Sequence, residues 1–203
     1  MDLQDAGGGV AADPGIRDRI LRAGARLFSE HGYDSVSLRH ICEEARVSKG
    51  AIYHHFASKE DLFVAIVAAA LEQLLHHARL SMAGEAHAAG RLRAFIIGQA
   101  ELFDTEANGC RVAMSRLASL FDSREGRARV EELRRRYIRT LQKLFADGIA
   151  AGEFARIDVR AATRMVLAIL YWLARWYEPV GRSSAVEIAA AHADIMLRGV
   201  CKR

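Results

Sequence analysis

Proline is nearly absent from this chain of 203 residues, and this scarcity constrains the fold more than any other feature. The two prolines are Pro14 and Pro179, so the 164 residues from 15 to 178 contain no residue of the kind that breaks helices. Over most of that length apolar residues recur every three or four positions, as on the buried face of a helix, and no alternating β pattern competes. The sequence therefore predicts an all-α protein.

Turn-forming and helix-capping residues divide this pattern into nine predicted helices. Gly32 suits the end of the first helix because glycine tolerates a left-handed backbone there. Serines precede three of the next helices and can cap them, while Ser184 and Glu187 have the spacing of a capping box. Residues 1–13 are expected to form a disordered tail. The predicted helices are 16–31, 38–46, 49–56, 58–81, 88–105, 111–120, 125–151, 159–177 and 185–199.

Composition is typical of a soluble globular protein. Apolar residues make up 51% and charged residues 27% of the sequence, with a mean hydropathy of +0.01. The strictly apolar run from Met165 to Ala174 has 10 residues, about half of the 20 or so that cross a bilayer. The N-terminus has neither the cationic start nor the apolar core of a secretory signal. We therefore expect a cytoplasmic protein without a membrane partner, and the net charge of +4 permits a polyanionic one.

Residue patterns for catalysis or metal binding are missing from the sequence. It has no G-x-S-x-G, H-E-x-x-H, Walker or dinucleotide-binding motif, and no two of its eight histidines are three or four residues apart. Cys42, Cys110 and Cys201 are widely spaced and predict neither a disulfide framework nor a zinc site. Cys110 lies at a predicted helix start, where the helix dipole favours a thiolate. Two roles are therefore open for it: a sensor of electrophiles or oxidants, or simply a small residue at the start of a helix. We expect no enzyme, cofactor or metal.

Residues 37–56 have the pattern of a helix-turn-helix, the motif in which a second short helix enters the major groove of DNA. On that second helix Ile52 and Phe56 are four residues apart and mark the buried face. The opposite face then carries a cation, a phenol and an imidazole, which suit phosphate oxygens and base edges. The predicted DNA-binding residues are Ser37, Arg39, Ser48, Lys49, Gly50, Tyr53, His54 and Lys59.

These residues have chemical reasons to bind DNA and a plainer alternative. Lys49 offers a cation to a phosphate or a guanine edge, and Gly50 lets the backbone approach closely. Ser37 combines a hydroxyl with the free N–H groups of a helix start, which is a natural phosphate site. In the alternative, Tyr53 is half-buried packing, Lys49 is a solubilising charge and the neighbouring histidines are surface residues. Taken together, the set favours DNA binding.

The stretch IRDRILRAGARLFSEHGYDSVSLRHICEEARVSKGAIYHHFASKEDLF resembles the N-terminal domain of the TetR family of bacterial transcriptional repressors. It departs from the family at Cys42, where the family usually has alanine. The resemblance implies a three-helix DNA-binding head over residues 14–61, followed by a six-helix effector-binding and dimerisation domain over 62–203. The segment GEFARIDVRAATRMVLAIL is similar to family branches that sense acyl-CoA thioesters or other lipophilic metabolites.

Aromatic and thioether side chains in the C-terminal half outnumber what a thin helical bundle needs, which favours an effector pocket. Trp172 and Trp176 are four residues apart on one helix face, with Arg175 beside them. A lipophilic ligand with an anionic end fits this set, an acyl-CoA thioester first and a planar aromatic compound second. For each residue the alternative is plain core packing. The predicted ligand-binding residues are Phe95, Phe103, Met114, Phe121, Tyr137, Phe145, Trp172, Arg175 and Trp176.

The last two predicted helices indicate a homodimer. The helix over 159–177 is apolar nearly all round beyond its first residues, and the helix over 185–199 carries Ala189, Ala193 and Met196 in a small-residue stripe. One chain cannot cover both surfaces, so we expect a two-fold four-helix interface and a palindromic operator. The predicted function is a ligand-responsive repressor. The alternative is an all-α small-molecule carrier or helical scaffold, in which the N-terminal helix-turn-helix domain has a structural role and does not bind DNA.

Overall fold

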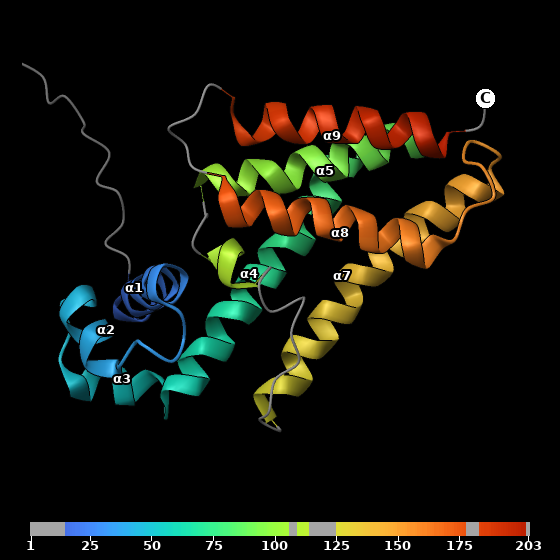
Figure 1. Cartoon of the computed structure of the whole chain (residues 1–203). Helices are drawn as coiled ribbons and strands as arrows, with labels where there is room; N and C mark the ends of the chain where they lie inside the picture. The colour runs from blue at the N-terminus through green and yellow to red at the C-terminus, as the bar shows by residue number, and fades with distance from the viewer. Residues whose placement is uncertain (1–14, 106–108, 114–124, 178–182, 202–203) are drawn as a thin grey trace, which may run out of the picture.

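The computed structural model describes residues 15–105, 109–113, 125–177 and 183–201, which are almost entirely helical (Figure 1). The all-α prediction is confirmed. Residues 109–113 are helical as well, while the rest of the helix predicted over 111–120 and the predicted tail lie outside the described residues. The labelled helices are α1 (Ile16–His31), α2 (Leu38–Ala45), α3 (Lys49–His55), α4 (Lys59–Met82), α5 (Ala88–Thr105), α7 (Glu125–Ala150), α8 (Val159–Trp176) and α9 (Ala185–Val200).

Helix starts are capped as the sequence predicts. Ser37, Ser48 and Ser58 precede α2, α3 and α4, and each hydroxyl accepts the backbone N–H three residues further on at 3.0–3.2 Å. Ser184 and Glu187 form the predicted capping box of α9, with reciprocal hydrogen bonds of 3.1 and 2.8 Å. These caps satisfy N–H groups that the first turn of a helix leaves unpaired. Each of these helices therefore begins where a capping residue directly precedes it in the sequence.

Helices α1, α2 and α3 pack against one another, and their buried apolar residues belong to the single hydrophobic core of the described residues. Ile20, Ile41 and Ile52, one from each helix, are fully buried there. Helix α1 also lies against α4, and the two helices approach closely, since a Cβ added at Gly24 would lie 2.9 Å from Ile66 Cδ1. The three short helices are therefore connected to the rest of the chain through α4.

Helix α4 is the buried connector of the fold. It leads away from the three N-terminal helices in Figure 1 and packs against α1, α5 and α7. By length and composition alone α4 is apolar enough to cross a membrane, although the sequence analysis predicts no membrane span. In the protein 56% of its most apolar window is buried inside the structure, as in the core helix of a soluble protein.

Helices α5, α8 and α9 lie side by side beyond α4, and α7 packs against α4, α5 and α8 (Figure 1). The turn after α7 ties this part together. Glu153 accepts the backbone N–H groups of Ala88 and Ala89 at 2.7 and 3.4 Å, so it caps α5 from a distant segment. Next to it, Phe154 forms an antiparallel bridge with Cys201, which follows α9. One short loop thus fixes the start of α5 and the end of α9.

Gly148→Ala is expected to destabilise the protein by about 1 to 3 kcal/mol. Gly148 lies in α7, where an added Cβ would lie 2.6 Å from Phe154 Cε2 and 2.8 Å from Ala88 Cβ, in residues that are both buried. The control is Gly199→Ala in α9, where an added Cβ meets nothing within 4 Å. Alanine should stabilise that position by roughly 0.5 to 1 kcal/mol. Denaturant unfolding compares the two variants, and equal free energies of unfolding would contradict the tight packing at Gly148.

Candidate nucleic-acid interface

The turn between α2 and α3 sets the angle at which α3 is presented. Arg46 ends α2 in a left-handed conformation with φ 54°, and the Val47 N–H then donates to the Cys42 carbonyl at 3.0 Å. Ile52 of α3 and Phe56, the residue that caps its end, are buried as predicted. The opposite face of α3 is therefore turned to solvent.

Five residues of α3 are exposed, namely Lys49, Gly50, Tyr53, His54 and His55, and the first four, which the sequence predicts as DNA contacts, are here called the α3 face. Tyr53 exposes 49% of its surface, and the Lys49 Nζ lies 5.7 Å from the centroid of its ring. The nearest atom to a Cβ added at Gly50 is the Ser48 hydroxyl at 3.8 Å, so the backbone there is open to a close approach. The structure places these four predicted residues together, as the periodicity indicates.

The start of α2 carries a second group of polar atoms. The His40 N–H donates to Ser37 Oγ at 3.2 Å, and the Ser37 N–H donates to His40 Nδ1 at 3.3 Å. Histidine takes the position that glutamate has in the usual capping box. The S-x-x-H spacing in the sequence could have predicted this role of His40. Arg39 is exposed and its Nε donates to Glu43 at 2.9 Å, which engages one of the five N–H donors of the guanidinium.

Lys59 is placed differently from the other predicted DNA contacts. Its Nζ donates to the backbone carbonyls of Tyr33 and Val36, each at 2.8 Å, and lies 4.2 Å from the centroid of the Tyr33 ring. The side chain is partly buried and reaches back to the loop that joins α1 to α2. The structure therefore gives the Lys59 ammonium protein partners and does not place it on the α3 face with Lys49.

Most of the predicted ligand-binding residues lie in the C-terminal part of the chain. Two of them, Met114 and Phe121, lie outside the described residues. Four are buried and form the buried aromatic set, namely Phe95, Phe103, Tyr137 and Phe145. The rings of Phe95 and Tyr137 lie 5.7 Å apart, which joins α5 to α7. The burial of these four side chains fits both of the roles considered above, plain core packing and the lining of a ligand site.

A short chain of polar groups runs through this buried region. The Tyr137 hydroxyl donates to Gln99 Oε1 at 2.8 Å, and Gln99 Nε2 donates to the Leu74 carbonyl of α4 at 3.2 Å. Burial, with a smaller contribution from Cys110, raises the pKa of Tyr137 well above its ordinary value. The hydroxyl therefore remains a proton donor. Sequence reasoning did not single out Gln99, although a glutamine at an apolar position of α5 was visible.

Trp172, Arg175 and Trp176 lie apart from the buried aromatic set. They are exposed on the outer side of α8, where the two tryptophans expose 60% and 53% of their surface. Helix α8 turns Val166 and Leu170 inward instead. The four-residue spacing does place the tryptophans on one face, but periodicity alone does not say which face meets the core.

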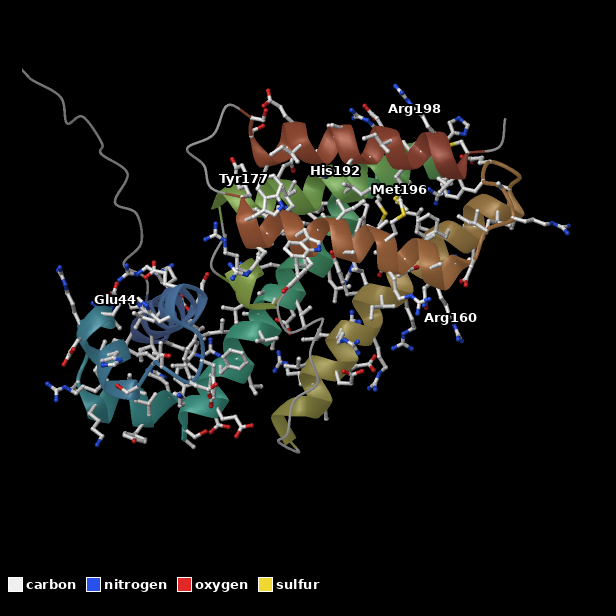
Figure 2. The ribbon with its side chains drawn as sticks, viewed as in Figure 1. Glu44, Arg160, Tyr177, His192, Met196 and Arg198 are labelled. Carbon is white, nitrogen blue, oxygen red and sulfur yellow. The ribbon has the colours of Figure 1, made fainter. Side chains whose placement is uncertain are left out.

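The predicted small-residue stripe of α9 is used inside the chain, which corrects its assignment to the dimer surface. Ala189, Ala193 and Met196 are buried, and α9 packs along α5. Figure 2 shows Met196 on the inner side of α9. Small residues allow two helices to approach closely, and here α5 uses that space. The apolar side chains that α8 and α9 do expose, here called the outer apolar face, are Met165, Trp172, Trp176 and Ile195.

Comparisons with known proteins agree with this architecture. Residues 20–66 match the bacterial regulatory proteins of the tetR family, and residues 85–200 match the tetracyclin repressor-like C-terminal domain. The HTH-type transcriptional repressor KstR2 of Rhodococcus jostii is 26% identical over 187 residues, which cover 92% of this chain and 91% of that protein.

Two solved structures show the same fold. PfmR of Thermus thermophilus, a TetR-family transcriptional regulator, is 34% identical with a TM-score of 0.79, over 89% of this chain and 98% of that one. AibR in complex with isovaleryl coenzyme A and operator DNA is 23% identical with a TM-score of 0.78, over 89% of this chain and 97% of that one. At this identity the likeness shows a common fold and nothing more. The family matches and the helix-turn-helix geometry lead to one conclusion: the chain is a DNA-binding transcriptional regulator and belongs to the TetR family.

Proposed function

We propose that this chain is a homodimeric repressor that binds a palindromic operator through α3 and leaves it when a small lipophilic effector binds. The α3 face is the observation that carries the proposal. Ile52 and Phe56 hold α3 against the core, while Lys49, Tyr53 and His54 stay exposed. We assign residues 14–61 to DNA binding and residues 62–203 to effector binding and dimerisation. The two family matches, over residues 20–66 and 85–200, support this division.

The α3 face suits a major groove. Tyr53 and His54 supply a hydroxyl and a ring nitrogen for phosphate oxygens, and Gly50 lets the helix approach without a side chain in the way. Ser37 and Ser48 cap the two helices of the motif, so each hydroxyl lies beside the N–H groups of a helix start, where phosphates bind. Arg39 joins this set, since its pair with Glu43 engages only the Nε of the guanidinium.

Lys49→Ala is expected to weaken operator binding and to lower the salt slope of binding by about one for each subunit, because one phosphate contact is lost. The control is Lys143→Ala in α7, which removes the same charge from an exposed lysine paired with Asp147 at 2.9 Å. That variant should keep the wild-type slope. Affinity measured over a series of salt concentrations compares them, and a Lys49→Ala variant that behaves like wild type throughout would remove Lys49 from the interface.

The outer apolar face supports dimerisation through α8 and α9. Trp172, Trp176 and Ile195 each expose more than half of their surface, and tryptophan is enriched where proteins bind one another. A two-fold axis through this face would pair α8 and α9 with their copies and place two α3 faces on one duplex. The operator should then consist of two inverted half-sites.

The buried aromatic set supports a lipophilic effector, for which we propose an acyl-CoA thioester. Phe95, Phe103 and Phe145 offer an apolar environment for an acyl chain, and the Tyr137–Gln99 pair offers the few polar atoms that orient a ligand. AibR, which shares this fold, is known in complex with isovaleryl coenzyme A. Arg175 lies on the exposed side of α8, so the anionic end of the ligand needs another partner.

Two measurements test this function. In the first, the purified protein selects duplexes from a random pool, and the bound duplex is footprinted. A footprint with two-fold symmetry supports the proposal, whereas failure to select any duplex supports the carrier or scaffold alternative.

In the second measurement, the selected duplex is titrated with palmitoyl-CoA, with free coenzyme A as the control. A 100-fold loss of operator affinity corresponds to about 2.7 kcal/mol of coupling, and operator DNA must weaken palmitoyl-CoA binding by the same factor. If palmitoyl-CoA leaves operator binding unchanged, long-chain acyl-CoAs are rejected as effectors while the DNA-binding assignment stands.

A further inference from the structure

Lys59 links the start of α4 to the loop between α1 and α2. An ammonium group has three N–H donors, and Lys59 uses two of them on the carbonyls of Tyr33 and Val36, each at 2.8 Å. Its charge also lies 4.2 Å from the centroid of the Tyr33 ring, within the range of a cation–π contact. Charge-assisted hydrogen bonds of this length are among the stronger ones in proteins.

The Val36 carbonyl is the informative partner. It belongs to the peptide group that continues into Ser37, whose N–H donates to His40 Nδ1 at 3.3 Å. A single peptide group is thus held at its oxygen by Lys59 of α4 and at its nitrogen by His40 of α2. Because Ser37 is also the N-cap of α2, the starts of α2 and α4 are connected by a direct polar link.

The apolar contacts around this link do not by themselves fix the orientation of the loop relative to α4. Phe28 of α1, Tyr33 of the loop and Phe63 of α4 form a ring cluster with centroids 4.9–5.5 Å apart. Aromatic pairs accept a range of offsets and angles, whereas a hydrogen bond to a fixed carbonyl loses strength when its geometry changes. The two bonds of Lys59 therefore restrict rotations that the ring cluster would allow.

We propose that Lys59 is a positioning residue that locks the start of α2 to α4, so that the helix-turn-helix and α4 turn as one body. The proposal rests on the proposed binding of a two-site operator, since the lock then sets the distance between the two α3 faces of a dimer. The sequence alone predicts a phosphate contact for Lys59. The two roles give opposite results in the experiments that follow.

Amide hydrogen exchange tests the lock without DNA. Lys59→Met keeps the apolar stem and removes both donors, so exchange of residues 33–38 should become about tenfold faster or more. The buried helix amides of Ile20 and Ile52 should keep their protection. The matched control is Lys49→Met, which should leave the loop unchanged. If the loop of Lys59→Met exchanges like wild type, the lock is overturned. If Lys59→Met does not fold, Lys59→Gln replaces it, because its shorter, uncharged amide keeps N–H donors but loses the charge-assisted bonds.

Operator binding gives the second readout. With the duplex selected by the wild-type protein, Lys59→Met should bind about tenfold more weakly with an unchanged salt slope, because no phosphate contact is lost. It should also lose less affinity than wild type when one base pair is inserted between the half-sites, since a loosened head tolerates a new spacing.

A phosphate contact would give the opposite pattern in Lys59→Met. The salt slope would fall by about one per subunit, the spacing preference would match wild type, and the lock would be overturned. If the wild-type protein selects no duplex, the proposed function fails, and the exchange measurement still decides whether Lys59 holds the loop.

Discussion

Trp172→Asp is expected to convert the protein from a dimer to a monomer at micromolar concentration. Trp172 lies on the outer apolar face of α8 with 60% of its surface exposed, next to Trp176 one turn away. A tryptophan in the centre of an interface contributes about 2 kcal/mol or more, and a two-fold interface contains it twice. Its loss from both subunits should therefore raise the dimer dissociation constant by roughly 1,000-fold or more. The buried, unpaired carboxylate of the variant adds a desolvation cost. Sedimentation equilibrium measures the change.

The matched control is Leu80→Asp. Leu80 of α4 is also 60% exposed, so the same charge replaces an equally accessible apolar side chain outside the outer apolar face. This variant should remain dimeric. If both variants dimerise like wild type, the interface lies on another surface. If Trp172→Asp is monomeric, its affinity for the two-site operator should fall sharply, because only one α3 face is then delivered to each duplex.

Tyr137→Ala is expected to cost about 3 to 5 kcal/mol in the free energy of unfolding. Tyr137 is fully buried, packs against Phe95 and donates its hydroxyl proton to Gln99. The matched variant Tyr137→Phe keeps the ring and leaves Gln99 Oε1 without this donor, which should cost about 1 to 3 kcal/mol. Urea unfolding separates the two contributions. A Tyr137→Phe variant as stable as wild type would mean that the hydroxyl contributes little to the fold.

The pH dependence of stability isolates the same hydroxyl. Burial raises the pKa of Tyr137 well above its ordinary value of 10.0, so above about pH 10 the unfolded chain releases a proton that the folded chain keeps. The contribution of Tyr137 to stability is therefore complete below pH 10 and falls as the pH rises further. Tyr137→Phe lacks this loss, so the difference in the free energy of unfolding between this variant and wild type should narrow as the pH rises above about 10. Parallel profiles for the two proteins would contradict the burial of the hydroxyl.

Features set by neighbouring residues in the chain could be predicted from the sequence. Ser48 caps α3 because its hydroxyl needs to reach only three residues onward. Ile52 and Phe56 are buried together because they are one turn apart. From these two facts the exposed side of the recognition helix follows. The same local chemistry places Ser184 at the start of α9.

Features that depend on distant partners could not be predicted in this way. Lys59 binds carbonyls 26 and 23 residues earlier in the chain, and no sequence pattern pairs a lysine with a backbone oxygen. The spacing of Trp172 and Trp176 fixes their common face, but the packing of α8 on its neighbours decides whether that face is inside or outside. The stripe that includes Ala189 was predicted to lie in a dimer interface, and this prediction is wrong because its partner is α5 of the same chain.

The location of the tryptophans has a practical consequence for spectroscopy. Trp172 and Trp176 are the two tryptophans of the chain, and both lie on the outer side of α8. Indole emission shifts to shorter wavelength when the ring loses contact with water, so the intrinsic fluorescence of the protein should shift with its concentration as subunits associate. A ligand enclosed by Phe95 and Tyr137 would not touch either indole. Any change that such a ligand causes in the emission would therefore report a movement of α8 or of the subunit interface rather than the filling of the ligand's own site.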